Sequence, residues 1–115
     1  MKFLGVILTS ARRLIAKARD RNPKQWRYVL TDDLPDPPAA HRVYLVGEDG
    51  VLWYAAMLCP CDCGATLHMS LHKEGTPRWK ATPHRDGTIS LSPSVWRKIG
   101  CRSHFIVRNG RIIWC

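Results

Sequence analysis

The chain has 115 residues, 45% of them hydrophobic, which excludes an intrinsically disordered chain and a membrane-embedded one and predicts a single domain. Eighteen Lys and Arg residues against nine Asp and Glu residues give a formal net charge of +9 at pH 7. This charge favours nucleic acid, anionic lipid or an acidic protein as a partner. The basic residues are scattered along the sequence and not massed in one block, which weakens the case for nucleic acid.

The cysteine count and the N-terminal sequence indicate a reducing compartment. Five cysteines cannot all pair within one monomer, so a disulfide framework is not expected. The chain starts with an apolar run of about six residues followed by Arg12 and Arg13, which is not the architecture of a signal peptide. No stretch approaches the roughly 20 apolar residues of a spanning helix. We therefore predict a cytoplasmic protein with no transmembrane segment and with reduced thiols.

The first 25 residues are predicted to form a basic amphipathic helix. Apolar residues recur at helical spacing over residues 3–20, and Arg12, Arg13, Lys17 and Arg19 occupy much of the other side. Pro23 ends the pattern. The helix either packs on the domain, which we favour, or docks on a partner or a membrane surface.

Residues 26–115 are predicted to form a metal-binding β domain. Acidic and proline-rich residues 31–40 form a connector, and turn signals occur at residues 47–50, 86–87 and 109–110. Residues 92–96, with Pro93 in a first-turn position, are expected to start a short helical turn. The predicted fold class is mainly β with one N-terminal helix, built on a small antiparallel sheet. The predicted strands are residues 26–30, 41–46, 51–58, 65–71, 79–81, 88–91, 104–108 and 111–114.

Two short Cys/His elements predict a four-ligand metal site between two hairpin turns. The first runs from Cys59 through Cys61 and Cys63 into Gly64, and the second is the Cys-x2-His of Cys101 and His104. Five residues thus compete for four positions. The predicted ligands are Cys61, Cys63, Cys101 and His104, with Cys59 as the substitute for one of the first two.

The donor set favours structural Zn²⁺. Three thiolates and one imidazole suit zinc in a zinc-ribbon-like arrangement. The alternative is a Rieske-like [2Fe–2S] cluster, for which the Cys-x2-His half fits. The first half does not fit, because Cys63 stands where a Rieske site has histidine. Cys115, at the end of the last strand, is expected to take no part.

The sequence favours a non-enzymatic role and identifies no catalytic residue. Ser/His/Asp order, a phosphate-binding loop and paired carboxylates are all missing from it. The ligands are plentiful enough for a closed metal site, whereas a catalytic zinc keeps an open position. A reactive thiol at Cys59 is the remaining catalytic alternative.

Four segments of the sequence resemble a family of small bacterial and phage proteins of unknown function. These segments are Cys59–Gly64, Ile89–Trp96, Cys101–Phe105 and Gly110–Trp114, and the resemblance covers roughly residues 40–115. Asp62 stands where the family has glycine. The family occurs beside genes for ubiquitin-activating-like (E1-like) and ubiquitin-conjugating-like (E2-like) proteins. The resemblance implies metal binding at Cys61, Cys63, Cys101 and His104, and no settled activity.

These inferences predict a small zinc-binding adaptor, acting in a bacterial ubiquitin-like conjugation or phage-defence pathway. Its expected partner is a protein, with an E1-like or E2-like protein as the candidate. The first alternative is a Rieske-like redox protein, which would be coloured when purified. The second is a basic zinc ribbon that binds nucleic acid, for which binding would fall steeply with salt.

Overall fold

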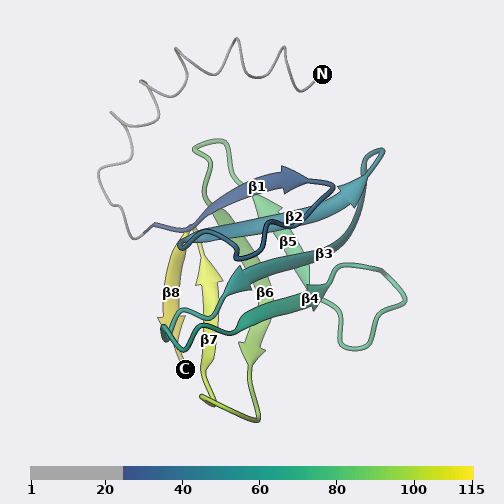
Figure 1. The fold of residues 1–115 in the computed structure, drawn as a ribbon. Helices are drawn as coiled ribbons and strands as arrows, with labels where there is room; N and C mark the ends of the chain where they lie inside the picture. The colour runs from purple at the N-terminus through teal and green to yellow at the C-terminus, as the bar shows by residue number, and fades with distance from the viewer. Residues whose placement is uncertain (1–24) are drawn as a thin grey trace.

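The computed structural model describes residues 25–115, which form eight strands in two four-stranded sheets. Figure 1 shows strands β1–β4 running across the view and strands β5–β8 running up and down behind them. The helix predicted for residues 3–20 lies outside the described residues. No helix in the described part of the chain is long and apolar enough to cross a membrane.

The first sheet has the strand order β1-β2-β3-β4. Strands β2, β3 and β4 form an antiparallel meander, and β1 pairs with β2 in parallel. A parallel neighbour cannot be reached by a tight turn, so the acidic connector of residues 32–41 crosses from the end of β1 to the start of β2. The strands are β1 (Arg27–Thr31), β2 (Arg42–Glu48), β3 (Val51–Leu58) and β4 (Thr66–Ser70).

The second sheet is antiparallel throughout, with the order β5-β6-β7-β8. Its pairing is irregular at one place: between Leu91 and Val95 of β6 the register against β7 shifts, which is a β-bulge. A bulge re-aims the side chains within it, and bulges are enriched next to active sites. The strands are β5 (Lys80–Pro83), β6 (Ile89–Trp96), β7 (His104–Arg108) and β8 (Arg111–Trp114).

One hydrophobic core joins the two sheets. Alternating residues point inward, so that in β7 Phe105 and Val107 are buried while Ile106 between them is half-buried. The core therefore lies between two sheets whose strands cross at a large angle, as in orthogonal sandwiches. Its buried members are Trp26, Val43, Leu45, Ala55, Met57, Cys59, Leu67, Met69, Ile89, Leu91, Val95, Phe105 and Val107.

Two-residue turns with positive φ angles close two of the hairpins. Asp49 and Gly50 have φ angles of 54° and 78°, and Asn109 and Gly110 have φ angles of 51° and 78°. Positive φ at both central residues matches the right-handed twist of the strands and requires Asn, Asp or Gly. A Cβ atom on Gly110 would lie 2.7 Å from the carbonyl oxygen of Trp26, so this glycine also permits a close approach.

The positions of the strands confirm the sequence prediction, but the predicted fold class is wrong for the described residues. They form two sheets that contain a parallel pair, not one small antiparallel sheet, and no helix. The helical turn predicted at residues 92–96 is also wrong, because these residues belong to β6. Pairing with β5 and β7 outweighs the local helix-start signals there.

We expect Asp86→Ala to destabilise the domain by about 1–3 kcal/mol, because it leaves a buried hydroxyl without its acceptor. Asp86 Oδ1 accepts hydrogen bonds from the backbone N–H (2.9 Å) and from Oγ1 (2.6 Å) of Thr88, whose side chain is buried. These two bonds, side chain first, lower the pKa of Asp86 in the folded state. The measurement is chemical unfolding of the variant and the parent protein.

A lowered pKa in the folded state also fixes how this effect depends on pH. The stabilisation is complete above the pKa of an unfolded aspartate, about 3.9, and is lost as the pH falls through the folded-state value. The difference in the free energy of unfolding between Asp86→Ala and the parent should therefore be largest at about pH 7 and should shrink below about pH 4. Glu48→Ala, at an exposed carboxylate that ends β2, is the matched control. An equal loss in both variants would contradict the prediction.

Candidate functional site

Four cysteines from two connections lie together at one end of the sandwich. The β3–β4 connection, residues 59–65, carries Cys59, Cys61 and Cys63, and the β6–β7 connection, residues 97–103, carries Cys101. Their four Sγ atoms lie within 4.8 Å of one another. Cys59 Sγ is 3.3 Å from Cys61 Sγ and 3.5 Å from Cys101 Sγ, and none of the four cysteines forms a disulfide. The cluster therefore joins a connection of the first sheet to one of the second.

The first connection is a tight turn fixed by its own backbone. The Cys59 N–H donates to the Ala65 carbonyl at 2.8 Å, and the Asp62 N–H donates to the Cys59 carbonyl at 3.2 Å. Asp62 and Gly64 have φ angles of 68° and 85°. Aspartate tolerates this left-handed region and glycine enters it without strain, so Asp62 in place of the family's glycine is accommodated.

Two polar side chains contact the sulfur atoms from outside the cluster. The buried Ser103 places Oγ 3.1 Å from Cys101 Sγ and 3.6 Å from Cys59 Sγ. Arg97 Nη1 donates to Cys101 Sγ at 3.3 Å and to Cys63 Sγ at 3.6 Å. A hydroxyl and a guanidinium in these positions stabilise negative charge on sulfur.

The surroundings divide the thiols by their acidity. Burial raises the pKa of Cys59 to about 12. Hydrogen bonding from Ser103 lowers the pKa of Cys101 to about 5, and it also lowers the pKa of Cys61. The cluster thus combines thiols that ionise readily with one buried thiol that holds its proton, and a cation bound among them would displace that proton.

The four-cysteine group fits a mononuclear metal site. In a tetrahedral site with Zn–S bonds of about 2.3 Å, neighbouring sulfurs are about 3.8 Å apart. The observed cluster, with its longest separation at 4.8 Å, is close to this size. Four thiols in this arrangement could hold a metal ion, and the donor set is compatible with zinc.

The structure brings together four of the five candidate ligands and places the fifth, His104, elsewhere. Cys61, Cys63 and Cys101 of the predicted set are joined by Cys59, the predicted substitute, and His104 is not in the group. Instead, His104 Nε2 lies 2.9 Å from Ser94 Oγ. The imidazole stacks on the ring of Trp96, with centroids 4.9 Å apart and an interplanar angle of 17°.

The β-bulge of β6 positions the serine of this pair. Ser94 lies between Leu91 and Val95, where the register shifts, and its carbonyl accepts a hydrogen bond from Trp79 Nε1 at 3.3 Å. Ser94 and His104 are both half-buried. The sequence singles out Ser94 only as part of the Ser-Pro-Ser segment, which predicts the start of a helical turn and not a contact with His104.

A second serine–histidine pair lies on the same sheet. Ser90 Oγ is 2.7 Å from His84 Nε2, and it also accepts a hydrogen bond of 2.8 Å from the backbone N–H of Asn109. Ser90 therefore links the β5–β6 and β7–β8 hairpins, which gives it a structural role. This pair provides an internal comparison for Ser94 and His104.

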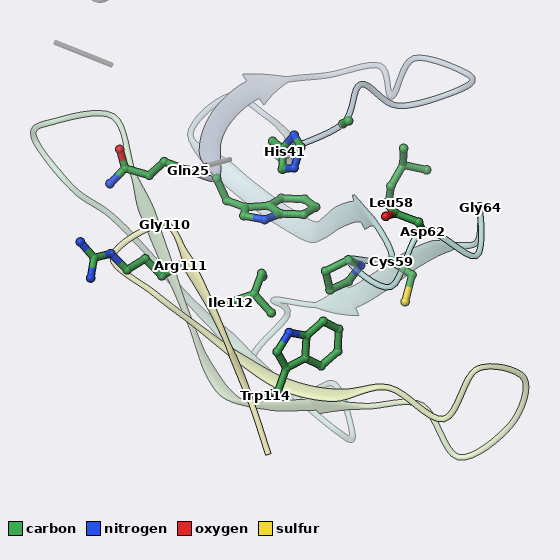
Figure 2. A pocket seen from close by; sticks show the side chains of 13 residues that line it. Gln25, His41, Leu58, Cys59, Asp62, Gly64, Gly110, Arg111, Ile112 and Trp114 are labelled. Atoms are coloured by element: carbon green, nitrogen blue, oxygen red, sulfur yellow. The ribbon is translucent and has the colours of Figure 1, made fainter. Parts of the chain in front are cut away.

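A cavity of about 600 Å³ lies beside the turn that carries Cys59. Figure 2 shows Ile112 and Trp114 of β8 on one side of it and His41 and Leu58 on the other. Trp26 also lines the cavity, and the centroid of its ring lies 5.3 Å from that of the His41 ring. Strand β8 is an edge strand of the second sheet, so this cavity lies beside a sheet edge.

Comparison with known proteins identifies the family. The family described as "Bacterial ubiquitination-like system serine protease (BubE)" matches residues 30–115. The chain belongs to this family, which confirms the resemblance to a small family associated with bacterial ubiquitin-like conjugation. No curated protein and no solved structure matches the chain.

We expect Cys59→Ser to lose bound metal and His104→Ala to retain it. A metal held by the four-cysteine group would have Cys59 as a ligand, whereas the set predicted from the sequence would have His104 in that place. The measurement is metal content per chain by elemental analysis, together with thermal unfolding. Cys115→Ser is the control, because Cys115 lies outside the cluster. Metal retained in Cys59→Ser and lost in His104→Ala would favour the sequence-based set.

Proposed function

We propose that this member of the BubE family is a serine protease that cleaves the bond at the C-terminus of the ubiquitin-like modifier of its system. Ser94 is the proposed nucleophile and His104 the proposed base. The observation that carries the proposal is the 2.9 Å distance between Ser94 Oγ and His104 Nε2, the separation that proton transfer between nucleophile and base requires.

The chemistry follows from this pair. With the imidazole proton on Nδ1, Ser94 Oγ–H donates to His104 Nε2. As Oγ attacks the scissile carbonyl carbon, Nε2 takes its proton and then gives it to the leaving amine, which leaves an acyl-enzyme. A water molecule, deprotonated by the same imidazole, releases the modifier with a free carboxylate and restores Ser94.

The indole of Trp96 supports the proposed base. In serine proteases a third group orients the imidazole. Here the imidazole lies against the Trp96 ring at a centroid distance of 4.9 Å, which fixes the plane of His104 while leaving Nε2 directed at Ser94. Lys98 Nζ lies 5.0 Å from the centre of the same indole.

The proposed pair is accessible to a large substrate. Ser94 and His104 are half-buried, and Trp96 beside them is 57% exposed. They lie on β6 and β7, the two central strands of the second sheet (Figure 1). The pair lies where these strands meet the β6–β7 connection, an open end of the sheet that suits the extended C-terminal tail of a folded modifier.

Zinc is the metal we propose for the four cysteines. Bound to Cys59, Cys61, Cys63 and Cys101, it would be structural and would cross-link the two connections. The β6–β7 connection joins Trp96 to His104, so this cross-link supports the serine–histidine pair. Because zinc needs reduced thiolates, the proposed setting is the cytoplasm.

The non-enzymatic adaptor predicted from the sequence is the competing hypothesis. An adaptor would bind the modifier, or an E1-like or E2-like protein, and leave the bond intact. The description of the family as a serine protease favours the protease, and Ser94–His104 is the serine–histidine pair to which the structure gives no second, cross-linking role of the kind that Ser90 has.

We expect Ser94→Ala and His104→Gln each to lower the rate of cleavage by a factor of roughly 10² or more, since each removes one partner of the proton transfer. The substrate is the modifier of the system fused at its C-terminus to a reporter protein, and cleavage is followed by mass spectrometry. Ser90→Ala is the matched control, because Ser90 also lies beside a histidine.

Labelling with a fluorophosphonate gives an independent readout. A reactive serine forms a phosphonyl ester, and peptide mapping of the labelled chain should locate it at Ser94. A loss of activity in Ser90→Ala with full activity in Ser94→Ala would move the nucleophile to Ser90. Binding of the modifier with no cleavage and no labelling would leave the adaptor as the function.

A further inference from the structure

We propose that the outer face of the second sheet binds an acidic surface of the modifier protein. This inference rests on the proposed function and deepens it, since it names the chemistry that brings the substrate to Ser94 and His104. The occupant is a folded protein partner with carboxylates around an apolar patch.

The strand register defines the outer face. In β7 Phe105 and Val107 point into the core, so His104, Ile106 and Arg108 point outward. Ile106 pairs with Ile113 of β8, and His104 pairs with Trp96 of β6. Directly opposed residues share a face. The outer face therefore includes Trp96, His104, Ile106, Arg108, Arg111 and Ile113.

This face keeps large apolar side chains in contact with solvent. Trp96 is 57% exposed and Ile113 is 39% exposed, with the half-buried Ile106 between β6 and β8. Together with His104 they form a row across the sheet that begins at the proposed base. Exposed apolar side chains that are grouped, and not scattered singly, mark interaction sites.

Charge is strongly divided between the two sheets. Residues 78–115, which contain the second sheet, carry eight Lys and Arg residues and one aspartate, Asp86. Residues 25–77, which contain the first sheet, carry three basic and seven acidic residues. Seven of the eight basic side chains of the second part are exposed. The half with the proposed catalytic pair thus attracts an acidic partner, and the other half repels it.

Two arginines border a hollow at the end of the apolar row. A cavity of about 460 Å³ is lined by Arg108, Asn109, Arg111 and Ile113, with Gln25 and Asp86. Arg108 and Arg111 pair directly across the β7–β8 hairpin, so their guanidinium groups leave the sheet side by side. Guanidinium groups bind carboxylates with two parallel hydrogen bonds, and the two arginines outweigh the one carboxylate of the lining, Asp86, so this hollow suits acidic side chains.

The apolar row favours a protein over nucleic acid. Tryptophan and arginine around a desolvated centre are the residues that dominate protein–protein binding energy. Isoleucine side chains form no hydrogen bonds with a phosphate backbone, and a protein surface that binds nucleic acid would have polar side chains at these positions. The face is therefore a protein interface with a basic rim.

The test reverses the charge of Arg108 and Arg111, which form the basic rim of this face. We expect Arg108→Glu combined with Arg111→Glu to raise the KM for the modifier–reporter fusion by about tenfold or more, with kcat unchanged. The matched control is Lys73→Glu combined with Arg78→Glu, which changes the charge equally in the exposed β4–β5 connection. In Figure 1 this connection lies on the opposite side from β8. Raised salt should weaken the parent and the control, and affect the rim variant less.

Two further readouts separate this proposal from the proposed function. Fluorophosphonate labelling of Ser94 needs no docking, so the rim variant should label like the parent. The affinity of the Ser94→Ala chain for the modifier needs no cleavage, so it measures docking even if the protease assignment fails.

Equal affinity of the rim variant and the control for the modifier would overturn the docking face. Competition settles the class of partner. Poly-glutamate should displace the modifier, whereas displacement by single-stranded DNA at a lower concentration would overturn the proposal in favour of nucleic acid.

Discussion

The close approach of four sulfur atoms is the constraint on which the rest of the structure depends. They join the β3–β4 connection of one sheet to the β6–β7 connection of the other, at an end of the sandwich where the hydrophobic core gives way to solvent. Thiolates at this distance repel one another unless a cation or protons lie between them. Cys59 belongs both to this cluster and to the core, so packing of the sheets and the state of the sulfurs are coupled.

The β6–β7 connection links the sulfur cluster to the serine–histidine pair. Residues 97–103 begin directly after Trp96 and end directly before His104. The Arg97 N–H donates to the Ser103 carbonyl at 2.8 Å, which closes the connection at its base, while both side chains contact the sulfur of Cys101. The bulge of β6 positions the other member of the pair, because it directs Ser94 toward His104. A change at the sulfurs thus reaches the pair through one short segment.

Much of the fold was predictable from the sequence because its signals are local. Alternating apolar residues and the Asp49–Gly50 and Asn109–Gly110 turns located the strands. The division into two sheets and the parallel β1–β2 pair depend on partners far apart in sequence, which no local pattern encodes. Three cysteines within five residues predicted a cluster of thiols, and the structure brings them together with Cys101 in a group that could hold a metal ion. The position of His104 could not be predicted from Cys-x2-His spacing, because the pleat of β7 decides it: with Phe105 in the core, His104 points to the outer face.

That orientation allows the proposed metal site and the proposed catalytic pair to occupy one small domain. A tetrahedral site is complete with four sulfurs, so it has no need of an imidazole. A histidine bound to a metal through Nε2 cannot also take a proton there, because the lone pair is already used. Cys59 completes the group of four sulfurs, and His104 can therefore contact Ser94 instead. Cys59 as the fourth sulfur leaves the imidazole available as a base, on the face where the exposed apolar and basic side chains gather.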